Sequence, residues 1–165
     1  MLMGQMPSEL KNKPFTLHQA AKLGMSRYLL GKLVAEGIVE LVARGVYRVS
    51  NGDSSEEDQY RIATLRTGSP SAICLVSALS HHELTDTIPR QTWIMVPASK
   101  RSKYPDLKLL RTRNPKWRVG IEKHDGYSMT SIERTLVDAI RARARIGTQI
   151  ATAALRKAVR SKKTT

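Results

Sequence analysis

The sequence of 165 residues has little cysteine, few aromatic residues and a shortage of acidic residues. Its one cysteine, Cys74, excludes an internal disulfide and any metal site built from several cysteines. No apolar run approaches the roughly 18 residues that a membrane-spanning helix needs. The first ten residues also lack the charged and then apolar layout of a signal peptide. We therefore expect a soluble cytoplasmic protein with no membrane partner.

The shortage of acidic residues leaves a formal net charge of +14. Such a charge repels itself within a compact protein and is typical of chains that bind a polyanion. Lys and Arg outnumber Asp and Glu by 7 to 3 in residues 1–50 and by 17 to 5 in residues 101–165, whereas residues 51–100 are mildly acidic. Two basic regions therefore flank an acidic middle.

The small, polar and acidic segment of residues 50–59 is the best candidate for a domain boundary. We predict a first domain at residues 1–55 and a second at residues 56–165, since the chain is long enough for two small domains.

The sequence pattern of the first domain predicts two short helices followed by a β-hairpin. Thr16 and Ser26 are residues that cap helix N-termini, and a glycine follows each predicted helix. The second helix carries apolar residues at spacings of three and four, which form a buried stripe. Two β-rich runs then flank the pair Arg44-Gly45, as in a tight hairpin turn. This is the layout of a winged helix-turn-helix, with its second helix offered to the major groove of DNA.

Candidate DNA contacts in this domain combine cations, hydroxyls and one aromatic residue. Ser26 and the helix N-terminus after it can bind a phosphate, and Arg27 can donate two hydrogen bonds to guanine. The alternative is a packing or protein-contact module whose cations are merely solvated. The full candidate set is Thr16, Ser26, Arg27, Tyr28, Lys32, Arg44 and Arg48.

For residues 56–165 the sequence predicts a small α+β domain with a mixed sheet. We therefore expect the whole chain to have an α+β fold. Thr130 and Glu133 match a capping box at the start of a helix. The three arginines at positions 141, 143 and 145 are spaced by two, which predicts that they spread around this helix. In the last helix, Ile150, Ala154 and Leu155 are expected to point inward.

A second basic patch lies in the middle of this domain. It could extend the DNA footprint, bind RNA or contact an acidic partner, and nothing in the sequence decides between them. The patch comprises Lys100, Arg101, Lys103, Lys108, Arg111 and Arg113.

Two groups of residues suggest metal chemistry. The run Ser80–Glu83 could hold a metal or a nucleophile, but adjacent residues on a helix point about 100° apart, and His18 and His124 are isolated in the sequence. Asp106 and Glu122 could bind a divalent metal as in a small nuclease, but His124 stands where that pattern needs a lysine. We expect no metal, no cofactor and no catalytic residue, and the nuclease stays open as an alternative.

Three blocks of the sequence resemble one known family. Residues 15–50, "FTLHQAAKLGMSRYLLGKLVAEGIVELVARGVYRVS", are similar to the N-terminal domain of AbiEi-type antitoxins of type IV toxin–antitoxin systems. Residues 77–97 and 127–140 are similar to that family's "SAL…HGLTDQIP" and "TSPERTLVD" regions. The family more commonly has Gly at the position of Glu83 and Pro at that of Ile132.

The resemblance implies an antitoxin and transcriptional repressor that binds inverted repeats in double-stranded operator DNA. It also implies a role in phage defence by countering a nucleotidyltransferase toxin encoded beside it, without a firm expectation of a stable complex. Because repeated half-sites take two or more copies, we expect a monomer that binds cooperatively or a weak dimer. A stand-alone winged-helix transcription factor without a toxin is the remaining alternative.

Overall fold

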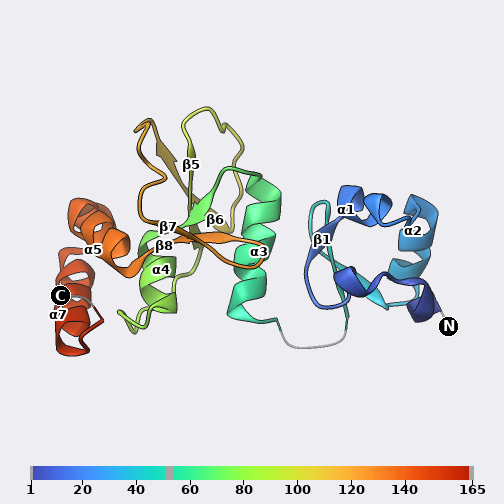
Figure 1. The fold of residues 1–165 in the computed structure, drawn as a ribbon, viewed down its shortest axis with the longest axis horizontal. Helices are drawn as coiled ribbons and strands as arrows, with labels where there is room; N and C mark the ends of the chain where they lie inside the picture. The colour runs from blue at the N-terminus through green and yellow to red at the C-terminus, as the bar shows by residue number, and fades with distance from the viewer. Residues whose placement is uncertain (1, 51–53, 164–165) are drawn as a thin grey trace. The chain divides into compact units, whose positions relative to one another are not determined.

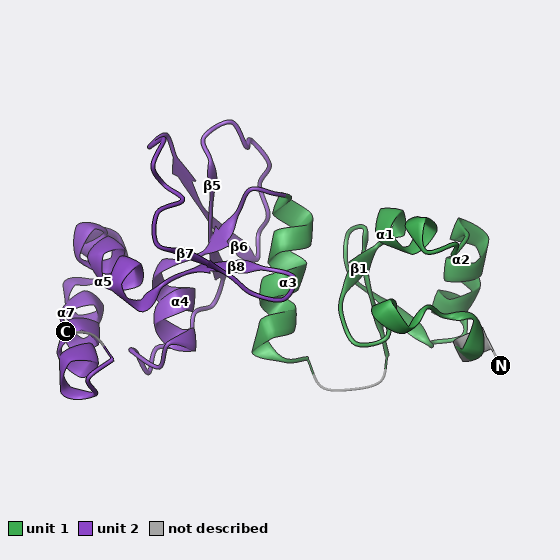
Figure 2. Ribbon diagram, in the orientation of Figure 1, with its two compact units in different colours: residues 1–68 green, residues 69–165 purple. Residues whose placement is uncertain are grey.

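In the computed structural model, which describes residues 2–50 and 54–163, the chain forms two compact units of mixed α+β structure (Figure 1). They comprise residues 1–68 and residues 69–165 (Figure 2). This division lies after Gly68 and not after residue 55, because helix α3 (Glu56–Thr67) groups with the first unit. Residues 55–59 of the acidic segment therefore include the start of a helix: Ser55 caps α3, and three acidic residues occupy its first turn.

The first unit is a winged helix-turn-helix. Strand β3 pairs antiparallel with both β1 and β2, which gives a three-stranded sheet of order β1-β3-β2. Helix α3 contacts all three strands. Its elements before α3 are the 3-10 helices η1 (Leu2–Gln5) and η2 (Ser8–Leu10), then β1 (Phe15–Thr16), α1 (Leu17–Lys22), α2 (Arg27–Ala35), β2 (Val39–Ala43) and β3 (Val46–Val49).

Both predicted helix caps are present. The Thr16 hydroxyl accepts the Gln19 N–H at 3.2 Å, and the Gln19 side chain accepts the Thr16 N–H at 2.8 Å. The Ser26 hydroxyl accepts the Leu29 N–H at 3.1 Å. Gly24, between the two helices, has a φ of +85°, which a glycine adopts without steric cost. The caps and this turn set the direction of α2.

Apolar residues of α2 pack with the sheet in a single cluster. Leu30 and Leu33 of α2 are buried with Phe15, Val39 and Val49, whereas Leu29 and Val34 pack at the margin of this cluster. This confirms the predicted stripe. The opposite face of α2 is left exposed.

The second unit has a five-stranded mixed sheet of order β6-β5-β4-β8-β7. The pairs β5/β6 and β4/β8 are parallel, and the pairs β4/β5 and β7/β8 are antiparallel. The elements are β4 (Ala72–Ile73), α4 (Leu75–His81), β5 (Thr92–Pro97), β6 (Leu107–Thr112), β7 (Ile121–Lys123), β8 (Ser128–Thr130), α5 (Ile132–Arg141), α6 (Arg143–Ile146) and α7 (Thr148–Arg160).

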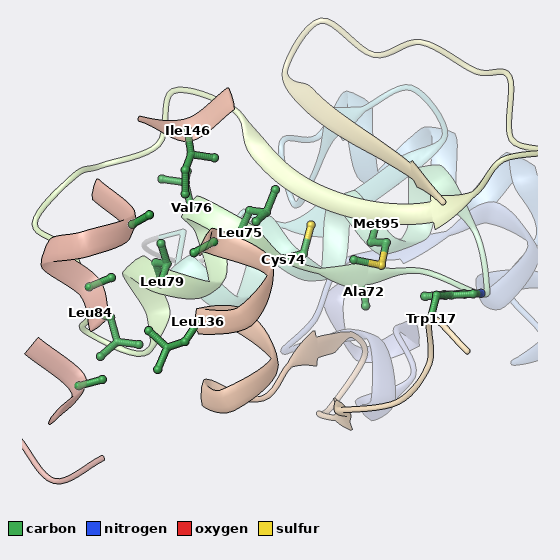
Figure 3. Close-up of a cluster of buried hydrophobic side chains, with 14 residues drawn as sticks. Ala72, Cys74, Leu75, Val76, Leu79, Leu84, Met95, Trp117, Leu136 and Ile146 are labelled. Atoms are coloured by element: carbon green, nitrogen blue, oxygen red, sulfur yellow. The ribbon is translucent and has the colours of Figure 1, made fainter. Parts of the chain in front are cut away.

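The core of this unit lies among the sheet, α4 and α5, and reaches α7 (Figure 3). Helix α7 contributes three buried alanines at positions 151, 154 and 158, whose small side chains allow α5 to approach closely. Leu155 was expected to point inward, but 40% of its surface is exposed. Ala154 is buried and Ile150 packs against the core as predicted, so the prediction was wrong for Leu155 alone.

Arg134 attaches α5 to the loop before β7. Its Nε donates to Asp138 Oδ2 at 2.8 Å, and its Nη1 donates to the carbonyl oxygens of Trp117, at 2.9 Å, and of Val119. The helix is capped by Ser131 and not by Thr130, because the Thr130 hydroxyl is buried against Thr135 in strand β8.

Candidate nucleic-acid interface

The exposed face of α2 carries a compact group of the side chains that the sequence predicts to contact DNA. Arg27, Tyr28, Gly31 and Lys32 all lie on it, since their spacing places them on one side of the helix. The Lys32 ammonium lies 5.0 Å from the centre of the Tyr28 ring. A carbon built onto Gly31 would meet no atom of the described residues within 4 Å, so the space immediately in front of it is open in this part of the chain. This surface is convex, cationic and open.

The N-terminus of α2 has an electrostatic feature that the other long helix of the unit lacks. Its first turn contains no acidic residue, and it begins with Arg27. By contrast, α3 begins with three acidic residues that offset the positive end of its dipole. The positive end of α2 is therefore reinforced, which costs helix stability but suits a phosphate ligand.

The two arginines of the wing have different environments. Arg44 is exposed at the hairpin turn, beside Gly45 with its φ of +76°. Arg48 is half-buried: its Nε donates to Glu40 Oε1 at 3.1 Å, and its Nη1 lies 3.8 Å from Asp58 Oδ2. Since Arg48 already has these two partners, Arg44 is the wing residue best placed to meet DNA. Thr16 likewise uses its hydroxyl in the capping box.

These elements match a known family. Residues 6–50, from before β1 to the end of the wing, match the family model described as transcriptional regulator, AbiEi antitoxin. Residues 6–50 are therefore similar to an AbiEi-type antitoxin domain. The match confirms the resemblance of residues 15–50, and it supports a role of the chain as a DNA-binding antitoxin regulator. No curated protein matches the chain. Within the described residues, no helix is long and apolar enough to cross a membrane.

The second basic patch lies outside the residues that match the family model. It is at one edge of the five-stranded sheet. Arg111 of the edge strand β6 donates to the carbonyl oxygens of Lys100, at 2.7 Å, and Ser102, at 2.8 Å, and so holds the loop before β6 against that strand. Lys108 lies over the ring of Trp93 at 5.9 Å. The patch is therefore a surface of β6 and its preceding loop.

The histidines are arranged differently from the sequence prediction. His124 is not isolated: its ring lies 6.1 Å from that of His81 and stacks on Tyr127 at 4.9 Å. The Nε2 of His82 lies 2.9 Å from the Thr130 carbonyl oxygen, and burial lowers the pKa of His82 below its ordinary value of 6.5. Among the residues that the structure describes, no group of three or more His, Cys, Asp or Glu side chains could hold a metal ion.

The two carboxylates of the nuclease alternative are far apart in the fold. Asp106 directly precedes β6, and Glu122 lies in β7, and these strands form the opposite edges of the sheet. Four strand spacings of about 4.8 Å separate them by roughly 19 Å. A shared metal ion needs both carboxylates within a few ångströms of it, so this pair does not form such a site. Cys74 is also no accessible nucleophile, because it is fully buried and burial raises the pKa of its thiol.

One cluster of cationic side chains was missed in the sequence. Arg141 and Arg145 line the same cavity, together with Arg111 and Arg134. The prediction that the arginines of this segment spread apart was wrong for this pair. No signal for it was present in the sequence, because α5 ends at Arg141 and α6 begins at Arg143, and the irregular residue Ala142 between them places the pair.

Proposed function

We propose that this chain represses its own operon by placing α2 in the major groove of inverted repeats upstream of its gene. The single observation that carries the proposal is the exposed cationic face of α2 at a helix N-terminus without acidic residues. In this arrangement, Arg27 reads base edges, and Ser26 with the backbone N–H groups after it meets a phosphate. Arg44 of the wing meets the neighbouring backbone.

The test is a footprint of the full chain on the DNA upstream of its own gene. We expect protection of two half-sites and a loss of protection in the double variant Arg27→Ala/Lys32→Ala. The control is Arg156→Ala/Arg160→Ala on α7, which removes the same charge from the second unit. Equal losses in the two double variants would mean that general charge, and not α2, accounts for binding.

We further propose that the chain is the antitoxin of a type IV pair and counters a nucleotidyltransferase toxin, with no nuclease activity of its own. The AbiEi match of the N-terminal unit supports the antitoxin role, and the separation of Asp106 from Glu122 supports the absence of a nuclease site. Co-expression with the neighbouring gene is the test: growth should be restored by the wild type and also by the Arg27→Ala/Lys32→Ala variant. If no neighbouring gene is toxic, the chain is a stand-alone regulator.

Binding to repeated half-sites also bears on the oligomeric state of the chain. We propose a monomer that binds cooperatively, or a weak dimer. Sedimentation with operator duplexes that carry one or two half-sites should give complexes of one and two chains. Two chains on a single half-site would contradict this.

A further inference from the structure

A cavity of about 460 Å³ opens in the second unit between the carboxyl end of β6 and the junction of α5 with α6. Its deepest residues are Leu75 and Met95, both buried. Two alanines of the helix junction, Ala142 and Ala144, line it and leave its mouth wide. We call this cavity the arginine pocket. Its other lining residues are Leu110, Arg111, Thr112, Asn114, Arg134, Asp138, Arg141 and Arg145.

The charge of the arginine pocket is strongly positive. Four arginines line it, from β6, α5 and α6, against the single carboxylate of Asp138, so the lining side chains carry a net charge of +3. Like charges that converge on one cavity repel each other, and this cost is removed when an anion of matching charge binds among them.

Two of the arginines are held in place by groups that leave donors available. The Arg111 guanidinium is fixed by two neutral carbonyl oxygens, so its charge is not cancelled. Arg134 is mostly buried, and its Nε and Nη1 bond Asp138 and two carbonyl oxygens. Its Nη2 contacts the Met95 sulfur at 4.0 Å, and a thioether is a weak acceptor. Both guanidiniums are thus preorganised to donate into the pocket.

The other two arginines form the rim. Arg141 ends α5 and Arg145 lies in α6, and both are exposed. Within the described parts of the chain, neither side chain forms a hydrogen bond or an ion pair. Arg143, between them, instead donates its Nη1 to the Ile140 carbonyl oxygen at 2.9 Å and does not line the pocket. The helix break at Ala142 therefore turns two arginines toward the pocket and one away.

The deep end of the pocket shows a further departure from ordinary backbone geometry. Leu75, at the turn from β4 into α4, has a φ of +47°. A branched side chain seldom adopts this conformation, and such residues cluster at ligand sites. Its position at the base of the arginine pocket is independent of the arginines and agrees with a binding role.

We propose that the arginine pocket binds a nucleotide through its phosphate groups. Guanidiniums bind phosphates with two parallel hydrogen bonds, and a net charge of +3 complements a chain of two or three phosphates. The volume lies within the range of roughly 300–1,000 Å³ that is typical of small-molecule sites. Thr112 and Asn114 supply hydroxyl and amide groups for the sugar or base. Because the pocket lies wholly in the second unit, this inference does not depend on DNA binding by the first.

The test is calorimetric titration of the full chain with ATP, AMP and inorganic pyrophosphate. We expect one saturable site per chain for ATP and pyrophosphate and weaker binding of AMP. Arg141→Gln and Arg145→Gln should each weaken ATP binding by about tenfold or more, the loss of one charge-assisted phosphate contact. Arg143→Gln is the matched control and should bind like the wild type. All three side chains are exposed, so circular dichroism should show unchanged folding.

Other outcomes would overturn the proposal. These are the absence of saturable nucleotide binding, and an equal loss in the Arg143→Gln control. The phosphate backbone of a nucleic acid is the other source of the same chemistry, so a short single-stranded oligonucleotide forms a separate arm. If the oligonucleotide binds in an Arg141-dependent way and the mononucleotides do not, the nucleotide assignment is wrong. Operator binding is measured in parallel, since its failure would concern the first unit alone.

Discussion

The Lys32 ammonium lies 5.0 Å from the centre of the Tyr28 ring, one helical turn away on the open face of α2. Tyr28 has 72% of its surface exposed, so the two side chains hold each other in place without packing against the core. An exposed cation–π contact contributes about 0.5–1 kcal/mol. If α2 enters the major groove as proposed, this contact orders two side chains before DNA arrives and so reduces the entropy lost on binding.

The space in front of Gly31 gives a test that separates stability from DNA binding. Gly31→Ala should stabilise the chain by about 1 kcal/mol, because alanine is the better helix former and its methyl group has no atom of the described residues within 4 Å. The same methyl group should weaken operator binding by roughly tenfold, since it would enter the contact between α2 and the groove. Urea unfolding and an operator titration measure the two effects.

Gln149→Ala, at an exposed position of α7, serves as the control for this pair of measurements. It should leave operator affinity unchanged. If Gly31→Ala gained stability and bound the operator as well as the wild type does, α2 would not approach DNA closely at this point.

Arg27 and Lys103 should differ in what they contribute to DNA binding. Arg27→Ala should lose about 1–3 kcal/mol of discrimination between operator and random DNA, because a base contact is removed. Lys103→Ala should weaken binding to both about equally and reduce the salt slope by about 0.9, because a phosphate contact is removed. Titrations at several salt concentrations measure both. Equal losses on both DNAs for Arg27→Ala would count against the assigned groove.

Because of His82, we expect the free energy of unfolding to decrease as the pH falls. Burial lowers its pKa in the folded chain below 6.5, and its neighbours His81 and His124 lower it further, whereas Glu122 and the Thr130 carbonyl act in the opposite direction. The unfolded chain therefore binds more protons near and below pH 6.5. The contribution of His82 is fully present above that pH and is lost as the pH falls through the folded pKa.

His82→Gln keeps an N–H donor for the Thr130 carbonyl oxygen and does not titrate. Its unfolding free energy should depend less on pH between about pH 8 and about pH 5 than that of the wild type. His18→Gln, at an exposed site in the first unit, should keep the wild-type dependence. Identical slopes for the wild type and His82→Gln would refute this assignment.

Glu83 occupies a backbone position that favours glycine. Its φ of +58° lies in the left-handed region, and its side chain forms an exposed ion pair with Lys163 at 3.1 Å. Glu83→Gly should be about 1 kcal/mol more stable than Glu83→Ala, because both lose the ion pair but only glycine relieves the strain. Thermal unfolding of the two variants tests this, and equal stability would show that the position is not strained.

Local chemistry explains why the first unit was predictable from the sequence. Thr16 and Ser26 satisfy helix N–H groups within three residues of themselves, and the glycines occupy positive φ values nearby. Each of these signals acts over a few residues. The positive φ of position 83 likewise explains why the family that the sequence resembles commonly has glycine there.

The second unit was predictable in its strands but not in their order. Strands β6 and β7 are neighbours along the chain, yet they form opposite edges of the sheet. A nuclease-like pattern in the sequence suggested a pair, Asp106 and Glu122, that the fold separates. His124 and His81 are distant in the sequence, but the fold brings their rings together. Pairing between strands depends on contacts across the whole unit, which a local pattern does not contain.

The arginine pocket depends on a single irregular residue. Ala142 has φ −94° and ψ 13°, which ends α5 and lets α6 begin in a new direction. An alanine favours an uninterrupted helix, so nothing in the sequence marks the break. Contacts of α6 with α7 and with the core override this preference.

Both tryptophans of the chain, Trp93 beside Lys108 and Trp117 in the core, lie in the second unit. Indole fluorescence therefore reports on that unit alone, while the first unit is visible only through its tyrosines and its backbone. Unfolding followed at the two signals would show directly whether the units melt together or one after the other. The same emission gives an optical signal for ligands that bind at the edge of the sheet near β6.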